Sequence, residues 1–108
     1  MLYLVSAQLI DNSISAEAFP QVFERVIRPS LESMAKMVDE KKVTGGVLAG
    51  QRAGAFILEA QSNEEVDRIL GGLPFWGLLK MTVTPLVLFR AAMERDQRAA
   101  DAMKASRH

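Results

Sequence analysis

Three polar residues stand at alternate positions of one apolar stretch near the C-terminus. Lys80, Thr82 and Thr84 are each two residues apart, and residues two apart on a β-strand lie on the same face of a sheet. In a cavity closed to water, the amine can bind a carboxylate or act as a base, and the hydroxyls can bind the same molecule. The alternative is that Lys80 is an edge lysine that prevents its strand from pairing with other chains.

Three further side chains are candidates for binding a substrate. Ser6 lies in an apolar stretch at the N-terminus, on the face that we expect to carry Lys80. Arg52 stands in a hairpin connection, where its guanidinium either holds an anionic ligand through paired hydrogen bonds or remains a solvated surface charge. Trp76 belongs to a loop. There it either covers a ligand as an aromatic lip, anchors a neighbouring subunit or packs in the core. The sequence thus predicts one catalytic residue, Lys80, and five substrate-binding residues, Ser6, Thr82, Thr84, Arg52 and Trp76.

Several kinds of site are excluded by residues that the chain lacks. It has no cysteine and a single histidine, His108, which removes thiolate metal sites, disulfides, cysteine nucleophiles and a conventional serine triad within one chain. The glycine pairs are not followed by Lys-Ser or Lys-Thr, so they form no phosphate-binding loop. We therefore expect neither a metal nor a cofactor.

Composition limits the class of protein and its partners. A chain of 108 residues with 49% hydrophobic and 24% charged residues is typical of one soluble domain. Thirteen basic residues balance thirteen acidic ones, which argues against a nucleic-acid partner. No apolar run approaches the roughly 18 residues of a membrane span, and the N-terminus lacks a secretory signal pattern. These features predict a cytoplasmic protein with no membrane partner.

The first half of the chain predicts a strand followed by a helix. Residues 2–10 are apolar and rich in strand formers, and they end at a turn, Asp11–Ser13. Ser15 is a candidate N-cap for a helix whose apolar residues recur every three or four positions up to Val38. Pro29 removes a backbone donor, so we expect the helix to kink or break near Arg28.

The second half predicts a hairpin, a short helix, a strand and a terminal helix. Strands at 43–51 and 55–60 flank a connection at 52–54, and Ser62 with Glu65 has the spacing of a capping box for a helix that ends at Gly71-Gly72. The next strand covers 78–89, with a bulge or an unpaired residue at Pro85. The alanine-rich segment 91–104 predicts the last helix.

This order of elements predicts an α+β fold of the ferredoxin-like βαββαβ type, with a four-stranded antiparallel sheet and an additional C-terminal helix. The two crossover helices cover one face of the sheet, and the other face needs a partner. We therefore expect a homodimer or a higher homo-oligomer in which uncovered faces pack together around a cavity. The predicted domains are residues 1–90, the ferredoxin-like body, and 91–108, the C-terminal helix and tail.

Two stretches carry a family resemblance. In the hairpin, Ala49-Gly50 precedes the turn and the following strand ends in Glu59; further on comes Leu73-Pro74-Phe75-Trp76, a Leu-Pro-aromatic loop. With these features the region from Met1 to Leu86 resembles the muconolactone isomerase family. The resemblance implies a dimeric α/β barrel whose subunits pair through their sheets, often assemble further, and hold small organic acids or lactones near the subunit boundary.

The chain departs from the isomerases that it resembles at reactive positions. Where they carry tryptophan, arginine and histidine on the second strand, this chain has 43–48, Val-Thr-Gly-Gly-Val-Leu. Leu4 and Ser6 replace histidine and lysine on the first strand, and the stretch 80–84 replaces acidic residues on the last.

Two functions remain open. One is isomerase-type proton transfer on a small organic acid or lactone, which needs a positioned base and a group that stabilises an enolate. The other is a non-catalytic ligand-binding or oligomeric assembly module, in which the cavity is mainly apolar and the terminal helix ties subunits together.

Overall fold

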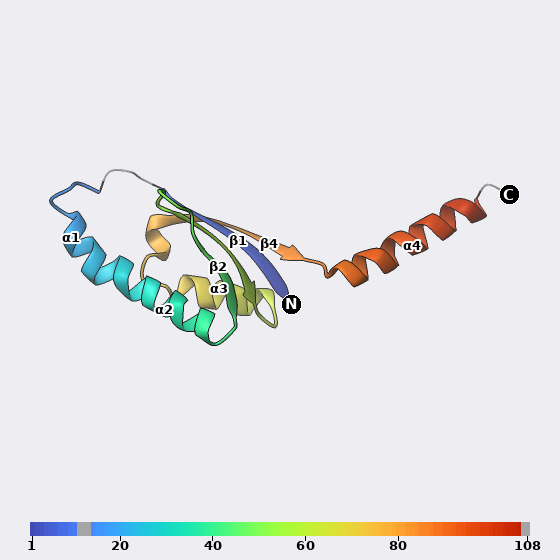
Figure 1. Cartoon of the computed structure of the whole chain (residues 1–108), viewed down its shortest axis with the longest axis horizontal. Coiled ribbons are helices and arrows are strands. Elements are labelled where there is room, and N and C mark those ends of the chain that lie inside the picture. The colour runs from blue at the N-terminus through green and yellow to red at the C-terminus, as the bar shows by residue number, and fades with distance from the viewer. Residues whose placement is uncertain (11–13, 107–108) are drawn as a thin grey trace.

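The structure is a computed structural model that describes residues 1–10 and 14–106. The turn predicted at Asp11–Ser13 and His108 lie outside the described residues. The order of elements confirms the predicted βαββαβ arrangement with an additional C-terminal helix (Figure 1). The elements are β1 (Leu2–Leu9), α1 (Phe19–Val22), a π-helical segment η1 (Phe23–Ile27), α2 (Arg28–Asp39), β2 (Val43–Val47), β3 (Ala53–Glu59), α3 (Asn63–Gly71), a 3₁₀ turn η2 (Trp76–Leu78), β4 (Leu79–Leu86) and α4 (Phe89–Ala105).

The four strands form one antiparallel sheet in the order β2-β3-β1-β4. All helices except α4 lie against one face of it (Figure 1). Side chains of β1 alternate accordingly, because successive residues of a strand point to opposite faces: Tyr3, Val5 and Ala7 are buried, and the residues between them are exposed. The core lies between the sheet and the helices. Its buried members are Tyr3, Val5, Val43, Phe56, Leu58, Ala60, Val66, Leu70 and Leu73.

The first helix is a continuous rod in which α1, η1 and α2 follow one another (Figure 1). Pro29 produces no break; the wider π-helical turn of η1 precedes α2, and the backbone stays right-handed helical through Arg28. Ser30 is fully buried just after the proline, where its hydroxyl donates to the Val26 carbonyl at 2.8 Å. The helix thus continues through Pro29 after a π-helical turn, and the predicted break is wrong.

The β2–β3 hairpin turns earlier than the sequence predicts. Ala53 and Gly54 already belong to β3, and Gly54 pairs with Val47. The chain reverses at 48–52, where Gly50 has a φ of 73°, a left-handed conformation that glycine adopts without strain. Gly50 therefore supplies the positive φ of this turn.

The start of α3 confirms the prediction. The Ser62 hydroxyl accepts from the backbone N–H of Glu65 at 3.1 Å, as in a capping box. The Glu65 carboxylate accepts from the backbone of Gln61, one residue before the usual partner.

The end of β4 differs from the prediction in two respects. The register runs through Pro85 opposite Tyr3, so the expected bulge is wrong. A proline is tolerated there because β4 is an edge strand, which pairs with β1 alone. The strand also ends at Leu86, and Phe89 begins α4 instead of ending β4.

Helix α4 projects away from the body and gives the molecule a longest extent of 71 Å (Figure 1). None of its described residues is buried, and Phe89 is 95% exposed. The outer face of the sheet is therefore not covered by this helix. Within the described part of the chain, every helix is too short or too polar to cross a membrane.

Candidate ligand cavity

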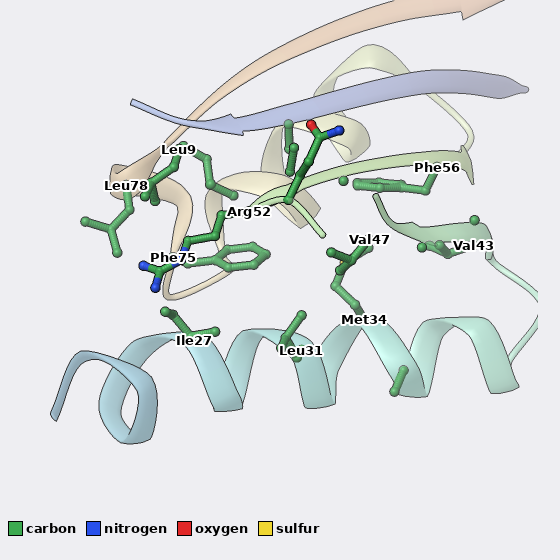
Figure 2. A pocket seen from close by; sticks show the side chains of 18 of the residues that line it. Leu9, Ile27, Leu31, Met34, Val43, Val47, Arg52, Phe56, Phe75 and Leu78 are labelled. Carbon is green, nitrogen blue, oxygen red and sulfur yellow. The ribbon is translucent and has the colours of Figure 1, made fainter. Parts of the chain in front are cut away.

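A cavity of about 420 Å³ lies between the sheet and the helical rod (Figure 2). It runs along the whole of β2, because both ends of that strand, Val43 and Val47, line it. Its lining is almost wholly apolar. The lining residues are Ala7, Leu9, Ile14, Phe19, Ile27, Leu31, Met34, Ala35, Val38, Val43, Gly45, Gly46, Val47, Gln51, Arg52, Ala53, Gly54, Phe56, Phe75, Leu78 and Leu79.

The cavity exists because small residues on the sheet face large residues on the helix. Gly54 pairs with Ala7 on one side and with Val47 on the other, so the middle of the sheet presents little side-chain volume at this place. Leu31 and Met34 project from α2 toward it (Figure 2). Side chains of this length do not fill the space above a glycine and an alanine.

Arg52 is the sole charged residue among the described residues of the lining. The hairpin turn brings it to one end of the cavity, near Phe75 and Leu78 (Figure 2). Its guanidinium carbon lies 4.6 Å from the centre of the Phe19 ring, within the range of a cation–π interaction. The contact links the hairpin to α1 and holds a positive charge beside an apolar space.

The cavity opens to solvent along the β2 edge of the sheet. Val47 on that edge is 62% exposed, and Leu31 and Val38 across from it on α2 are also exposed although both line the cavity. Apolar side chains therefore border an opening through which a small molecule can enter.

Four of the six predicted site residues lie together on the other side of the sheet. Ser6 pairs with Thr82, Gln8 with Lys80, and Leu4 with Thr84, so Ser6, Lys80, Thr82 and Thr84 share the uncovered face. All four are exposed. The shared face that the sequence predicts is thus present, but the cavity formed by the chain itself is behind it.

The remaining two predicted residues lie near the cavity end where the hairpin and η2 meet. Arg52 lines the cavity. Trp76, in η2, is 53% exposed and is not among the lining residues, whereas its neighbour Phe75 is. The Leu-Pro-aromatic loop therefore contributes to the cavity through its phenylalanine.

The apolar lining was not predicted from the sequence as a binding site. The apolar residues of the first helix, which include Leu31 and Met34, recur at helical spacing. Such a pattern is typical of residues that pack in the core. One signal in the sequence could have identified the cavity. The facing strands are rich in glycine and alanine, whose small side chains leave space opposite the large apolar residues of the helix.

The chemistry available in the cavity is binding. Its described lining contains no carboxylate, imidazole, thiol or hydroxyl, and a guanidinium is a donor that does not act as a base. In the described part of the chain, no group of three histidine or acidic side chains is placed to hold a metal ion.

Comparison with known proteins identifies the family. The family model described as muconolactone delta-isomerase matches residues 1–92. The chain belongs to the muconolactone isomerase family. A crystal structure of muconolactone isomerase shares its fold with a TM-score of 0.65 and 18% sequence identity, over 82% of this chain and 90% of that one. The search of curated proteins finds no match.

The muconolactone isomerase match confirms the family and the α+β fold that the sequence predicts. It includes the whole cavity and both groups of predicted site residues, and it ends four residues into α4. Most of α4 lies beyond the residues that the family model matches.

Proposed function

We propose that the chain binds a small, mainly apolar organic molecule in the cavity between α2 and the sheet. The observation that carries this proposal is a space of about 420 Å³ whose described lining is apolar except for Gln51 and Arg52. Its volume and composition are those of small-molecule sites in general, in which a few polar groups orient a ligand held by apolar contacts.

The composition of the lining favours binding over isomerisation at this site. Proton transfer next to a carbonyl needs a base within hydrogen-bond reach of the carbon acid and a donor for the enolate. Arg52 is suited to the second task, but no described lining residue is suited to the first. Of the two functions left open by the sequence, the cavity supports the non-catalytic one.

Isomerase-type proton transfer is the second candidate, and it belongs to the other side of the sheet. The pairing of Ser6 with Thr82 and of Gln8 with Lys80 supports it, because these pairs gather an amine and several hydroxyls on one face. In this proposal Lys80 acts as the base on a small organic acid or lactone, with Ser6, Thr82 and Thr84 as binding groups. Because all four are exposed in one chain, the proposal also needs a second copy that closes the face.

The partner that we propose is a second copy of this chain, which packs against that face. Muconolactone isomerases are known to form homo-oligomers, and in this chain the outer face of the sheet is left uncovered (Figure 1). We propose a homodimer or a larger homo-oligomer, with a cytoplasmic location.

A cavity-filling substitution tests the first candidate. Ala35 is exposed on α2 and lines the cavity, so Ala35→Trp is expected to fill the opening without disturbing the core. We expect apolar probes such as 2-naphthamide and 2-naphthoate to bind the native chain in calorimetric titrations and to lose at least tenfold in affinity in this variant, an estimate from the apolar surface that it displaces. Ser33→Trp, exposed on the same helix outside the lining, is the matched control. Equal affinities in all three proteins would contradict the proposal.

Proton exchange on lactones and keto acids tests the second candidate. If Lys80 is a base, the purified native chain exchanges substrate protons with deuterated solvent, and Lys80→Ala abolishes the exchange. If the chain is a ligand-binding module, neither protein shows exchange above the solvent rate.

A further inference from the structure

We propose that the ligand of the cavity is an amphiphilic anion with a single negative charge, whose carboxylate or similar oxyanion is held by Arg52 while its apolar body lies along β2. This inference rests on the proposed binding function and adds the chemical class and the orientation of the ligand.

The single charge follows from the lining. An ion that leaves water needs a partner of opposite charge or several hydrogen bonds, and the described lining offers one cation, Arg52. A ligand with one anionic group satisfies that cation. A second anionic group, or a cationic one, in the buried part of the cavity would lie among residues such as Val43 and Phe56 without a partner.

Among the side chains that the structure describes, the guanidinium of Arg52 is free to make this contact. It lies over the Phe19 ring at 4.6 Å, and a ring face engages the charge of a guanidinium without accepting one of its N–H groups in a conventional hydrogen bond. Within the described residues, the ion pairs join Arg28 to Glu24, Lys42 to Glu40 and Arg95 to Asp96, and none includes Arg52. Its planar array of donors therefore remains available for bidentate binding of an oxyanion.

The orientation follows from the position of Arg52 at one end of an elongated space. The hairpin turn places it beyond Val47, whereas Val43 and Phe56 lie toward the opposite end (Figure 2). The distance spanned by the five residues of β2 is about 13 Å at the usual rise of a strand. The anionic group therefore lies at the hairpin, and the apolar body extends from it between α2 and the sheet.

The chain offers a matched control for Arg52. The guanidinium carbon of Arg28 lies 5.0 Å from the centre of the Phe23 ring, so Arg28 also combines a positive charge with an aromatic face. It does not line the cavity, and it is paired with Glu24 at 3.2 Å. Arg52→Gln and Arg28→Gln thus remove the same charge from similar surroundings, one at the cavity and one away from it.

Calorimetric titration with 2-naphthoate and its neutral counterpart 2-naphthamide tests the inference. We expect the native chain to bind naphthoate about tenfold or more tightly than naphthamide, because charge-assisted hydrogen bonds are the stronger kind. Arg52→Gln is expected to make the two affinities equal, Arg52→Lys to keep part of the difference, and Arg28→Gln to keep all of it. Thermal unfolding of each variant checks that the fold is retained.

The possible outcomes separate this inference from the proposed function. If the native chain binds both probes with equal affinity, or if Arg52→Gln leaves the preference for naphthoate unchanged, the inference is wrong and binding in the cavity stands. If neither probe binds, the proposed function fails and the inference fails with it. If Arg28→Gln lowers the preference as much as Arg52→Gln, the preference reflects general surface charge, which also overturns the assignment to Arg52.

Discussion

Ser30 joins the helical rod to the loop that closes one end of the cavity. Its hydroxyl donates to the Val26 carbonyl at 2.8 Å and accepts from the backbone N–H of Phe75 at 2.9 Å. The Ser30 side chain is fully buried. Because it satisfies two backbone groups that are far apart in sequence, it fixes the position of Phe75 relative to α2.

Ser30→Ala is expected to destabilise the fold by about 1–3 kcal/mol, the usual effect of leaving buried hydrogen-bonding groups without a partner. Urea unfolding measures it, with Ser33→Ala, exposed on the same helix, as the control. An effect no larger than that of the control would show that water replaces the hydroxyl and that the hydrogen bonds to Val26 and Phe75 matter little.

Two adjacent glycines of β2 differ sharply in what they require. Gly45 has a φ of 140°, and a Cβ there would overlap the Ala55 carbonyl oxygen and lie 2.6 Å from Phe56 Cα. A Cβ on Gly46 would meet nothing within 4 Å. Gly45→Ala is therefore expected to lower the free energy of unfolding by about 2 kcal/mol or more through backbone strain and overlap, and Gly46→Ala is expected to change it little. Denaturant unfolding of the two variants compares them directly, and equal stabilities would refute the difference in backbone conformation.

The sequence predicts which site residues share a face of the sheet, because side chains alternate along a strand. It does not predict the positions of site residues in loops and turns. Lys80, Thr82 and Thr84 share a face because they alternate, and this follows from the spacing alone. That Arg52 lies in a cavity and Trp76 outside its lining depends on where the hairpin and the loop meet in space. Spacing along the chain contains no information about that meeting point.

At the scale of elements, the type and order of helices and strands were predictable, but three details of connection were not. The strands and the α3 cap follow from local alternation and capping chemistry. The π-helical turn before Pro29, the turn at Gly50 and the unbulged Pro85 were not predicted. Each depends on tertiary context: a buried Ser30, a pairing register, and a position on the edge of the sheet.

Helix α4 contributes least of all the helices to the stability of the body formed by residues 1–90. It has no buried residue in the described chain, and it follows β4 after a connection of two residues. We therefore expect residues 1–90 to fold without 91–108, with a free energy of unfolding within about 1 kcal/mol of the full chain, as for changes at exposed positions. Denaturant unfolding of the truncated chain, at a concentration where both proteins have the same subunit number, measures this. A truncated chain that does not fold would show that the proposed division into domains is wrong.

At the scale of the whole molecule, two surfaces that include apolar side chains are left uncovered. One is the outer face of the sheet, where Leu4, 42% exposed, lies beside the polar residues Ser6 and Thr82. The other extends from the end of β4 along α4 and includes Phe89, Met93 and Met103, each more than 60% exposed. Exposed apolar groups this large are typical of interaction sites, and an isolated helix with no buried face is only marginally stable in water. Both surfaces therefore favour a homo-oligomer. Its subunits are held together either through the sheet face or through α4.

Two variants decide between these surfaces. If the sheet faces pack together, Leu4→Glu places two carboxylates in a dry interface and is expected to raise the dissociation constant roughly tenfold or more. Removal of 91–108 then leaves the dimer intact. If α4 ties the subunits together, the truncated chain dissociates and Leu4→Glu does not. Light scattering of the native chain is first expected to give a mass of at least twice the 11.9 kDa of one chain. Ser33→Glu, exposed on the helical side, controls for the added charge. A native chain that stays monomeric at high concentration would remove both interfaces, and with them the closed face on which the proposed catalysis by Lys80 depends. The cavity beneath α2, which one chain forms by itself, would remain.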